Sequence, residues 1–109
     1  MKTILTNAFS LNMFADHHRH IVEFIPKTAH EAAQYLTEDW QSAVGHTDTA
    51  ALFSEQLGIP IPVNRVNVQL IPHQTRLIVG QYVGPRLPEG ATTLPDGAEI
   101  RWWLVVADR

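Results

Sequence analysis

The sequence predicts an α+β fold, close to the α/β class, in which a single domain over residues 1–109 holds a mixed sheet of about five strands flanked by helices. The 109 residues are 45% hydrophobic and 17% charged, which suits one core of modest size. Several short segments are rich in β-branched residues or alternate between apolar and polar residues, as strands do. Two other segments carry capping residues followed by apolar residues at helical spacing.

Five segments have the pattern of a strand, namely residues 3–6, 21–26, 63–70, 75–83 and 99–106. The alternation of apolar and polar residues is cleanest at 63–70. A turn at residues 72–74 predicts that segments 63–70 and 75–83 pair as antiparallel neighbours. That pairing would bring Arg65 near Gln81.

The first predicted helix covers residues 28–36. Thr28 and Glu31 have the spacing of a capping box, in which each side chain accepts a hydrogen bond from the other residue's backbone N–H. Alanine and leucine residues then recur at helical spacing, which predicts one face packed on the sheet.

A second helix is predicted directly after Gly45 and His46. Thr47 or Asp48 is its expected N-cap, and Gly58 is placed to end it in the left-handed conformation. The first turn of a helix offers unpaired N–H groups and roughly half a positive charge, so an anion can lie there beside the imidazole of His46. This arrangement suggests phosphate chemistry with a histidine. The alternative is a surface histidine with no role in chemistry.

The composition argues against several function classes. A formal net charge of −3 disfavours a protein that coats long nucleic acid, which needs a broad basic face. With 8 Lys and Arg residues, an anion site must use a few placed side chains, such as Arg65 and Arg86, together with backbone N–H groups. The absence of cysteine excludes disulfides, thiolate nucleophiles and cysteine-bound metals. No apolar run has the length of a signal peptide core or of a membrane span, so we expect a cytoplasmic protein.

The stretch of residues 7–13 carries polar side chains between apolar ones. Asn7, Ser10 and Asn12 suit contacts to phosphate oxygens or ribose hydroxyls. The alternative is a turn in which these side chains bond to nearby backbone groups.

Two loops carry residues that suggest chemistry. The stretch Asp16 to His20 has residue types that bind zinc, copper or nickel, but no second cluster completes a site, so we expect a solvated loop and no metal. Residues 84–90 are a loop by their glycines and prolines, and they hold Arg86 and Glu89. Ligand contacts often lie on such loops when a rigid sheet supports them.

Four motifs resemble those of the small ring nucleases that archaeal and bacterial viruses carry as anti-CRISPR proteins and that also occur in some type III CRISPR loci. The motifs are Asn7-Ala8-Phe9-Ser10-Leu11-Asn12-Met13, Gly45-His46 followed by Thr49, Asn64-Arg65-Val66, and Arg86-Leu87-Pro88-Glu89-Gly90. They span most of the chain in the same order. The first motif is specific by itself, and the others are specific as a series.

The resemblance implies a homodimer that binds cyclic tetra-adenylate, the second messenger of type III CRISPR complexes, and cleaves it without a metal ion or cofactor. It implies a catalytic role for His46 and for the loop pair Arg86 and Glu89. Residues that contact the ligand are implied at Ser10, Asn12, Arg65 and Gln81, and the polar pattern described above adds Asn7. Cleavage of the messenger would silence the ancillary nucleases that it activates.

An RNA linkage brings its own nucleophile, the ribose 2′-OH, so we expect positioning and acid catalysis from the protein. His46 is the expected acid on the departing 5′-oxygen, Arg86 or Arg65 would stabilise the phosphorane charge, and Glu89 would orient one of these groups. The product would be linear di-adenylate with a 2′,3′-cyclic phosphate or 3′-phosphate end. Two alternatives remain, namely a protein that sequesters the ring uncut and a structural or DNA-binding viral protein.

Overall fold

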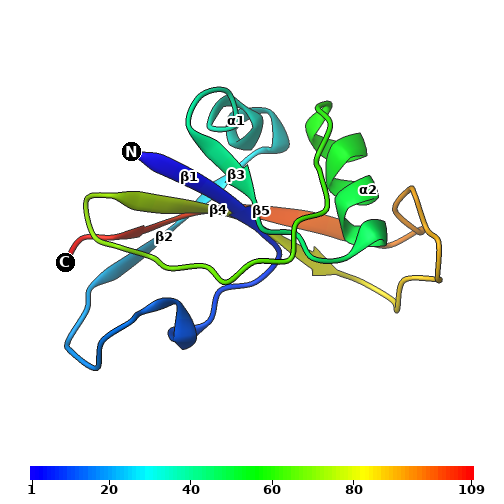
Figure 1. Ribbon diagram of the computed structural model, residues 1–109. Helices are drawn as coiled ribbons and strands as arrows, with labels where there is room; N and C mark the ends of the chain where they lie inside the picture. The colour runs from blue at the N-terminus through cyan, green and yellow to red at the C-terminus, as the bar shows by residue number, and fades with distance from the viewer.

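A five-stranded mixed sheet runs through the middle of the protein in the order β2-β5-β4-β1-β3 (Figure 1). The computed structural model describes all 109 residues. The strands are β1 (Lys2–Thr6), β2 (Val22–Lys27), β3 (Trp40–Ser42), β4 (Thr75–Val83) and β5 (Glu99–Ala107), with helices η1 (Leu11–Met13), α1 (Ala29–Gln34) and α2 (Thr47–Leu57). Strands β3, β1 and β4 are parallel, whereas β5 is antiparallel to both β4 and β2. The predicted α+β class, with one domain and five strands, is therefore confirmed.

The two faces of the sheet are covered differently. Helices α1 and α2 lie on one face, where they pack on side chains such as Leu5 and Ile78 (Figure 1). Their sequence neighbours Ile4 and Leu77 point to the other face, as alternation along a strand requires. That second face is covered by irregular chain, including the buried Leu70.

The helix starts follow the capping chemistry of the sequence, with one correction. Thr28 and Glu31 form the predicted capping box at the start of α1, and the hydrogen bonds from the Thr28 backbone and hydroxyl hold the pKa of the Glu31 carboxyl below its ordinary value. The N-cap of α2 is His46 and not Thr47 or Asp48. Its backbone is extended (φ −125°, ψ 133°) and its imidazole caps the helix, a role that is more common for Ser, Thr, Asp and Asn.

The end of α2 is as predicted, with Gly58 in the left-handed conformation (φ 72°, ψ 20°). None of the helices combines the length and the hydropathy that a membrane crossing needs.

The prediction of a strand at residues 63–70 is wrong, and so is the prediction that this segment pairs antiparallel with residues 75–83. The segment joins no ladder, and its hydrogen bonds are isolated. Among them, the Leu70 N–H donates to the Met13 carbonyl (2.8 Å). Because β4 runs parallel to β1, the chain that leaves α2 must travel back to the start of β4, and residues 63–70 cross the second face of the sheet to reach it (Figure 1).

The fifth strand of the sheet is β3, which the sequence did not predict. It is three residues long and pairs only with β1, so it has neither the length nor the alternation that would mark it in the sequence. Since β3, β1 and β4 are parallel, the segments that follow them all emerge at one edge of the sheet.

Candidate functional site

Three of the predicted site residues lie just beyond the edge at which the three parallel strands end. Asn7 directly follows β1, His46 lies four residues beyond the end of β3, and Arg86 lies three residues beyond the end of β4. In sheets with parallel strands, ligands bind in the crevice beyond the carboxyl ends of the strands. The topology of this protein therefore places the segments that carry Asn7, His46 and Arg86 at the same edge of the sheet.

A cleft of about 700 Å³ lies between the start of α2 and the loop that follows β4. It is lined by His46, Asp48 and Thr49 on the helix side and by residues 86–89 on the loop side. The three residues predicted to be catalytic, His46, Arg86 and Glu89, thus share one cavity, and all three are exposed to solvent.

The imidazole of His46 has a defined hydrogen-bond pattern. Its Nδ1 accepts a hydrogen bond from the backbone N–H of Asp48 (3.2 Å), and the first intrahelical bond runs from Ala50 N–H to the His46 carbonyl (3.0 Å). A nitrogen that accepts cannot carry a proton, so the neutral ring holds its proton on Nε2. Nε2 is then a donor that is free for a ligand in the cleft.

Arg65 packs against the backbone at Gly45, directly before His46. A Cβ at position 45 would lie 3.4 Å from both Cβ and Nε of Arg65, an ordinary van der Waals distance, so the Arg65 side chain lies directly against this part of the backbone. Asn64 fixes the segment, because its backbone N–H donates to the Val44 carbonyl and its amide donates to the Ser42 carbonyl, both at 2.8 Å. The backbone at Arg65 is thereby fixed, and the exposed Arg65 side chain lies beside Gly45, directly before the start of α2.

Asn7 and Gln81 lie in a second, smaller pocket of about 340 Å³ on the face of the sheet away from the helices. The pocket is otherwise largely apolar and includes Phe24, which is 50% exposed, and Trp103. The Gln81 carbonyl oxygen accepts from the Trp103 indole N–H (3.0 Å). Its amide N–H groups remain available to donate.

Ser10 and Asn12 line a groove of about 500 Å³ together with Asn67 and Gln69. The Ser10 hydroxyl accepts from the Asn12 backbone N–H (3.2 Å) and so caps η1, which leaves its own O–H to donate elsewhere. The local backbone role and a ligand role are therefore compatible for Ser10.

The structure separates two residues that the sequence placed together. Arg65 contacts Gly45, whereas Gln81 bonds to Trp103, because the strand pairing that would have joined them does not form. Sequence reasoning also missed Asp48, Asn67 and Gln69 as residues that line the cavities. The polar side of the 63–70 alternation was the available signal for Asn67 and Gln69.

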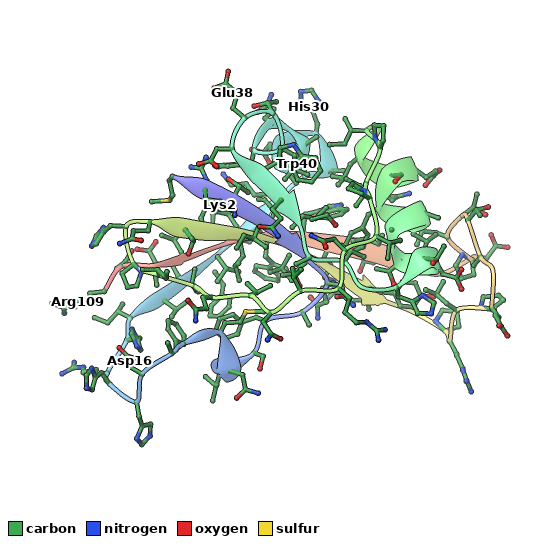
Figure 2. All side chains as sticks on the ribbon, viewed as in Figure 1. Lys2, Asp16, His30, Glu38, Trp40 and Arg109 are labelled. Atoms are coloured by element: carbon green, nitrogen blue, oxygen red, sulfur yellow. The ribbon has the colours of Figure 1, made fainter.

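The histidine-rich loop lies at the opposite edge of the sheet. Figure 2 shows Asp16 and Arg109 on the side of the molecule away from α2. His20 Nε2 donates to Asp16 (2.6 Å), His20 Nδ1 faces the Arg109 carbonyl (3.2 Å), and the ring stacks on Phe14. The bond to Asp16 raises the pKa of His20 and lowers the pKa of Asp16. No group of three or more His, Asp or Glu side chains in the protein is arranged to hold a metal ion.

Comparison with known proteins gives a family and a fold. The model of the STIV B116-like family matches residues 3–101. Among solved structures, B116 of Sulfolobus turreted icosahedral virus is similar with a TM-score of 0.79 and 24% sequence identity, over 97% of this chain and 99% of that chain. At this identity the likeness shows a shared fold. No curated protein sequence matches this chain significantly.

Proposed function

The chain belongs to the STIV B116-like family, and from its site we propose that it is a ring nuclease that binds cyclic tetra-adenylate and cleaves it to linear di-adenylate. The observation that carries the proposal is the cleft shared by His46, Arg86 and Glu89 at the carboxyl edge of the parallel strands. The four motifs that resemble viral anti-CRISPR ring nucleases supply the identity of the ligand. Such an enzyme would switch off the ancillary effectors of type III CRISPR systems.

The chemistry needs only groups that the cleft and the substrate provide. The ribose 2′-oxygen attacks the adjacent phosphorus, the bond from phosphorus to the 5′-oxygen breaks, and the 2′-OH proton passes to water. Holding the 2′-oxygen in line with the departing 5′-oxygen contributes up to several kcal/mol to catalysis. The nucleophile belongs to the substrate, so the protein need not supply one.

His46 is the proposed general acid. The acid is the imidazolium form, in which Nδ1 also carries a proton and gives up its bond from the Asp48 N–H. Nε2 gives its proton to the 5′-oxygen, and the Nδ1 proton then passes to solvent, which returns the neutral ring to the bond with the Asp48 N–H. Solvent also restores the proton on Nε2. Protonation of a leaving group by a positioned histidine is worth roughly 100-fold to 10,000-fold in rate.

The charged residues near His46 have separate proposed roles. Arg86 stabilises the charge that grows on the phosphorane oxygens, and Arg65 holds a neighbouring phosphate beside Gly45. Glu89 orients Arg86 or His46 from its place in the same loop.

We propose that two copies of the chain act together, because a ring of four nucleotides has two-fold symmetry that a two-fold dimer can match. A suitable face is the apolar one around Asn7 and Gln81, where the half-exposed Phe24 lacks cover. The expected molecular mass in solution is twice the 12.2 kDa of one chain. A monomer that cleaves the ring at full rate would remove the second copy from the proposal.

The function is tested by incubating the protein with cyclic tetra-adenylate in EDTA and identifying products by mass spectrometry. Wild-type protein is expected to yield di-adenylate, and His46→Asn and His46→Ala to be slower by roughly 100-fold or more. Asparagine is a good N-cap, so His46→Asn keeps the cap of α2, whereas His46→Ala should also lose about 1 kcal/mol of stability.

His30→Ala is the matched control, because His30 is an exposed histidine on α1 and its loss should leave cleavage unchanged. Binding without cleavage by the wild-type protein would replace the enzyme with a sequestering protein. If the wild-type protein neither binds nor cleaves the ring, both the enzyme and the sequestering protein are excluded.

A further inference from the structure

Asp48 contacts both halves of the proposed site. Its backbone N–H donates to His46 Nδ1 (3.2 Å), and its side-chain Oδ2 accepts from the backbone N–H of Gly90 (2.9 Å). The second bond joins residues 42 positions apart and links the first turn of α2 to the loop that carries Arg86 and Glu89.

The bond to Gly90 bears directly on Glu89. Residues 88–91 form a turn in which the Ala91 N–H donates to the Pro88 carbonyl (3.2 Å), and Gly90 occupies its third position with φ 78°. A positive φ at that position is the requirement of a type II turn and suits glycine. Glu89 precedes Gly90 in this turn, so the bond that holds Gly90 also fixes the place of Glu89.

A second bond holds the other end of the same segment. The Tyr82 hydroxyl donates to the Pro85 carbonyl, directly before Arg86. Arg86, Pro88 and Glu89 are exposed to solvent, so apolar packing does little to keep them in place. Two hydrogen bonds therefore flank the segment that carries Arg86 and Glu89, and only the one that Asp48 accepts joins it to the helix that His46 caps.

We propose that Asp48 is a positioning residue, which holds the Arg86–Glu89 segment against His46 so that the acid and the loop pair face the same phosphate. The role in catalysis rests on the proposed function, but the structural role does not. An asparagine at this position keeps an oxygen that can accept from Gly90 N–H and removes the charge. An alanine removes both.

The two variants Asp48→Asn and Asp48→Ala therefore separate the hydrogen bond from the charge. Both lose a carboxylate from the first turn of α2, so both lose its favourable interaction with the helix dipole. Only Asp48→Ala loses the bond to the loop. Any difference between the variants therefore reports on that bond.

The loop is measured first, by limited trypsin digestion of native protein with the cleaved bond identified by mass spectrometry. Trypsin can cut the exposed Arg86–Leu87 bond when the loop moves away from the helix. In Asp48→Ala this cleavage should be faster by about tenfold, the factor expected for loss of one charge-assisted hydrogen bond. In Asp48→Asn it should stay within about threefold of wild type. Equal digestion rates in wild type and Asp48→Ala would overturn the proposal, whether or not the protein cleaves any ring.

Ring cleavage is measured next, with cyclic tetra-adenylate as the substrate. Asp48→Ala should lower kcat by about tenfold, and Asp48→Asn should restore most of it, whereas a merely structural role would lower both alike. If both variants are slowed equally, the charge at the helix start matters and the bond to the loop does not, which contradicts the proposal. If trypsin separates the variants but wild type cleaves no ring, the proposed function fails while Asp48 still holds the loop.

Discussion

Strand β4 passes from closely packed core to exposed loop within a few residues, and the two regions are held by different forces. At Gly80 the strand lies beneath the rings of Phe53 and Trp102, which pack edge to face with centroids 4.9 Å apart. Beyond Val83 the chain enters the loop at 84–98, where the Tyr82 hydroxyl donates to the Pro85 carbonyl and the Asp48 carboxylate accepts from the Gly90 N–H. Apolar contacts hold the first region, and a few polar contacts hold the second.

The comparison teaches where stability and function reside in this chain. Buried rings contribute free energy through many contacts, so changes there should act on folding as a whole. A loop held by a few exposed hydrogen bonds opens at a small cost in free energy. Loops that move when a ligand binds need this low cost. Changes in the loop should therefore act on the site while the fold persists.

The largest effect on stability is expected at Gly80. A Cβ added there would lie 2.5 Å from Cζ of Phe53 and 2.7 Å from Cζ3 of Trp102, which real Cβ atoms essentially never do. Gly80→Ala must displace one of the rings, and overpacking of this kind destabilises by about 1–3 kcal/mol. Urea unfolding followed by tryptophan fluorescence measures the change in the free energy of unfolding.

Gly90→Ala is the matched change in the loop, and a smaller effect is expected. Nothing lies within 4 Å of a Cβ at this position, so the only penalty is the positive φ of 78°, about 1 kcal/mol. The variant should fold almost as stably as wild type but cut the ring more slowly, because the turn beside Glu89 is strained. If Gly90→Ala destabilised the protein more than Gly80→Ala, the contrast between the two regions would be wrong.

Local sequence chemistry predicted most of the fold, because capping residues and long alternating strands act over short distances. The capping box at Thr28 and the left-handed Gly58 are in place. The alternation at residues 63–70 was misleading: Leu70 is buried and Val68 partly buried against the sheet, but Val66 is exposed and the segment joins no ladder. Strand β3 was missed because three residues carry no period, and its place depends on long-range pairing with β1.

The site was also predicted only in part, because contacts between distant segments leave no local pattern in the sequence. His46, Arg86 and Glu89, for which the motifs imply catalytic roles, line one cleft, and the roles stay a prediction. The link from Asp48 to Gly90 joins distant segments through a backbone N–H, so no spacing in the sequence marks it. The prediction that Arg65 lies near Gln81 was wrong, because it depended on a strand pairing that does not form.

The smallest effect is expected at the histidine-rich loop, which like the loop at 84–98 is held by exposed polar contacts but lies at the other edge of the sheet. Both nitrogens of His20 face acceptors, the Asp16 carboxylate and the Arg109 carbonyl, so only the protonated ring can donate to both. The pKa of His20 is raised by the bond to Asp16, and that contribution to stability is present below the unfolded pKa near 6.5 and is lost as pH rises through the folded value. The contribution of Asp16 to stability has the opposite pH dependence. Its pKa is lowered, so its contribution is lost as pH falls.

Asp16→Asn should therefore reduce the free energy of unfolding more at about pH 5.5 than at about pH 8, and NMR titration should show the His20 midpoint moving downward toward its ordinary value. His18 also lies 3.4 Å from Asp16, so His18→Asn serves as the control that should leave the His20 midpoint almost unchanged. Ring cleavage should be unaffected in both variants, because the loop and the cleft lie at opposite edges of the sheet. A loss of cleavage in Asp16→Asn would mean that the polar contacts at the two edges are coupled. The two edges of the sheet would then not act independently, and the contrast between a folding region and a functional region would be wrong.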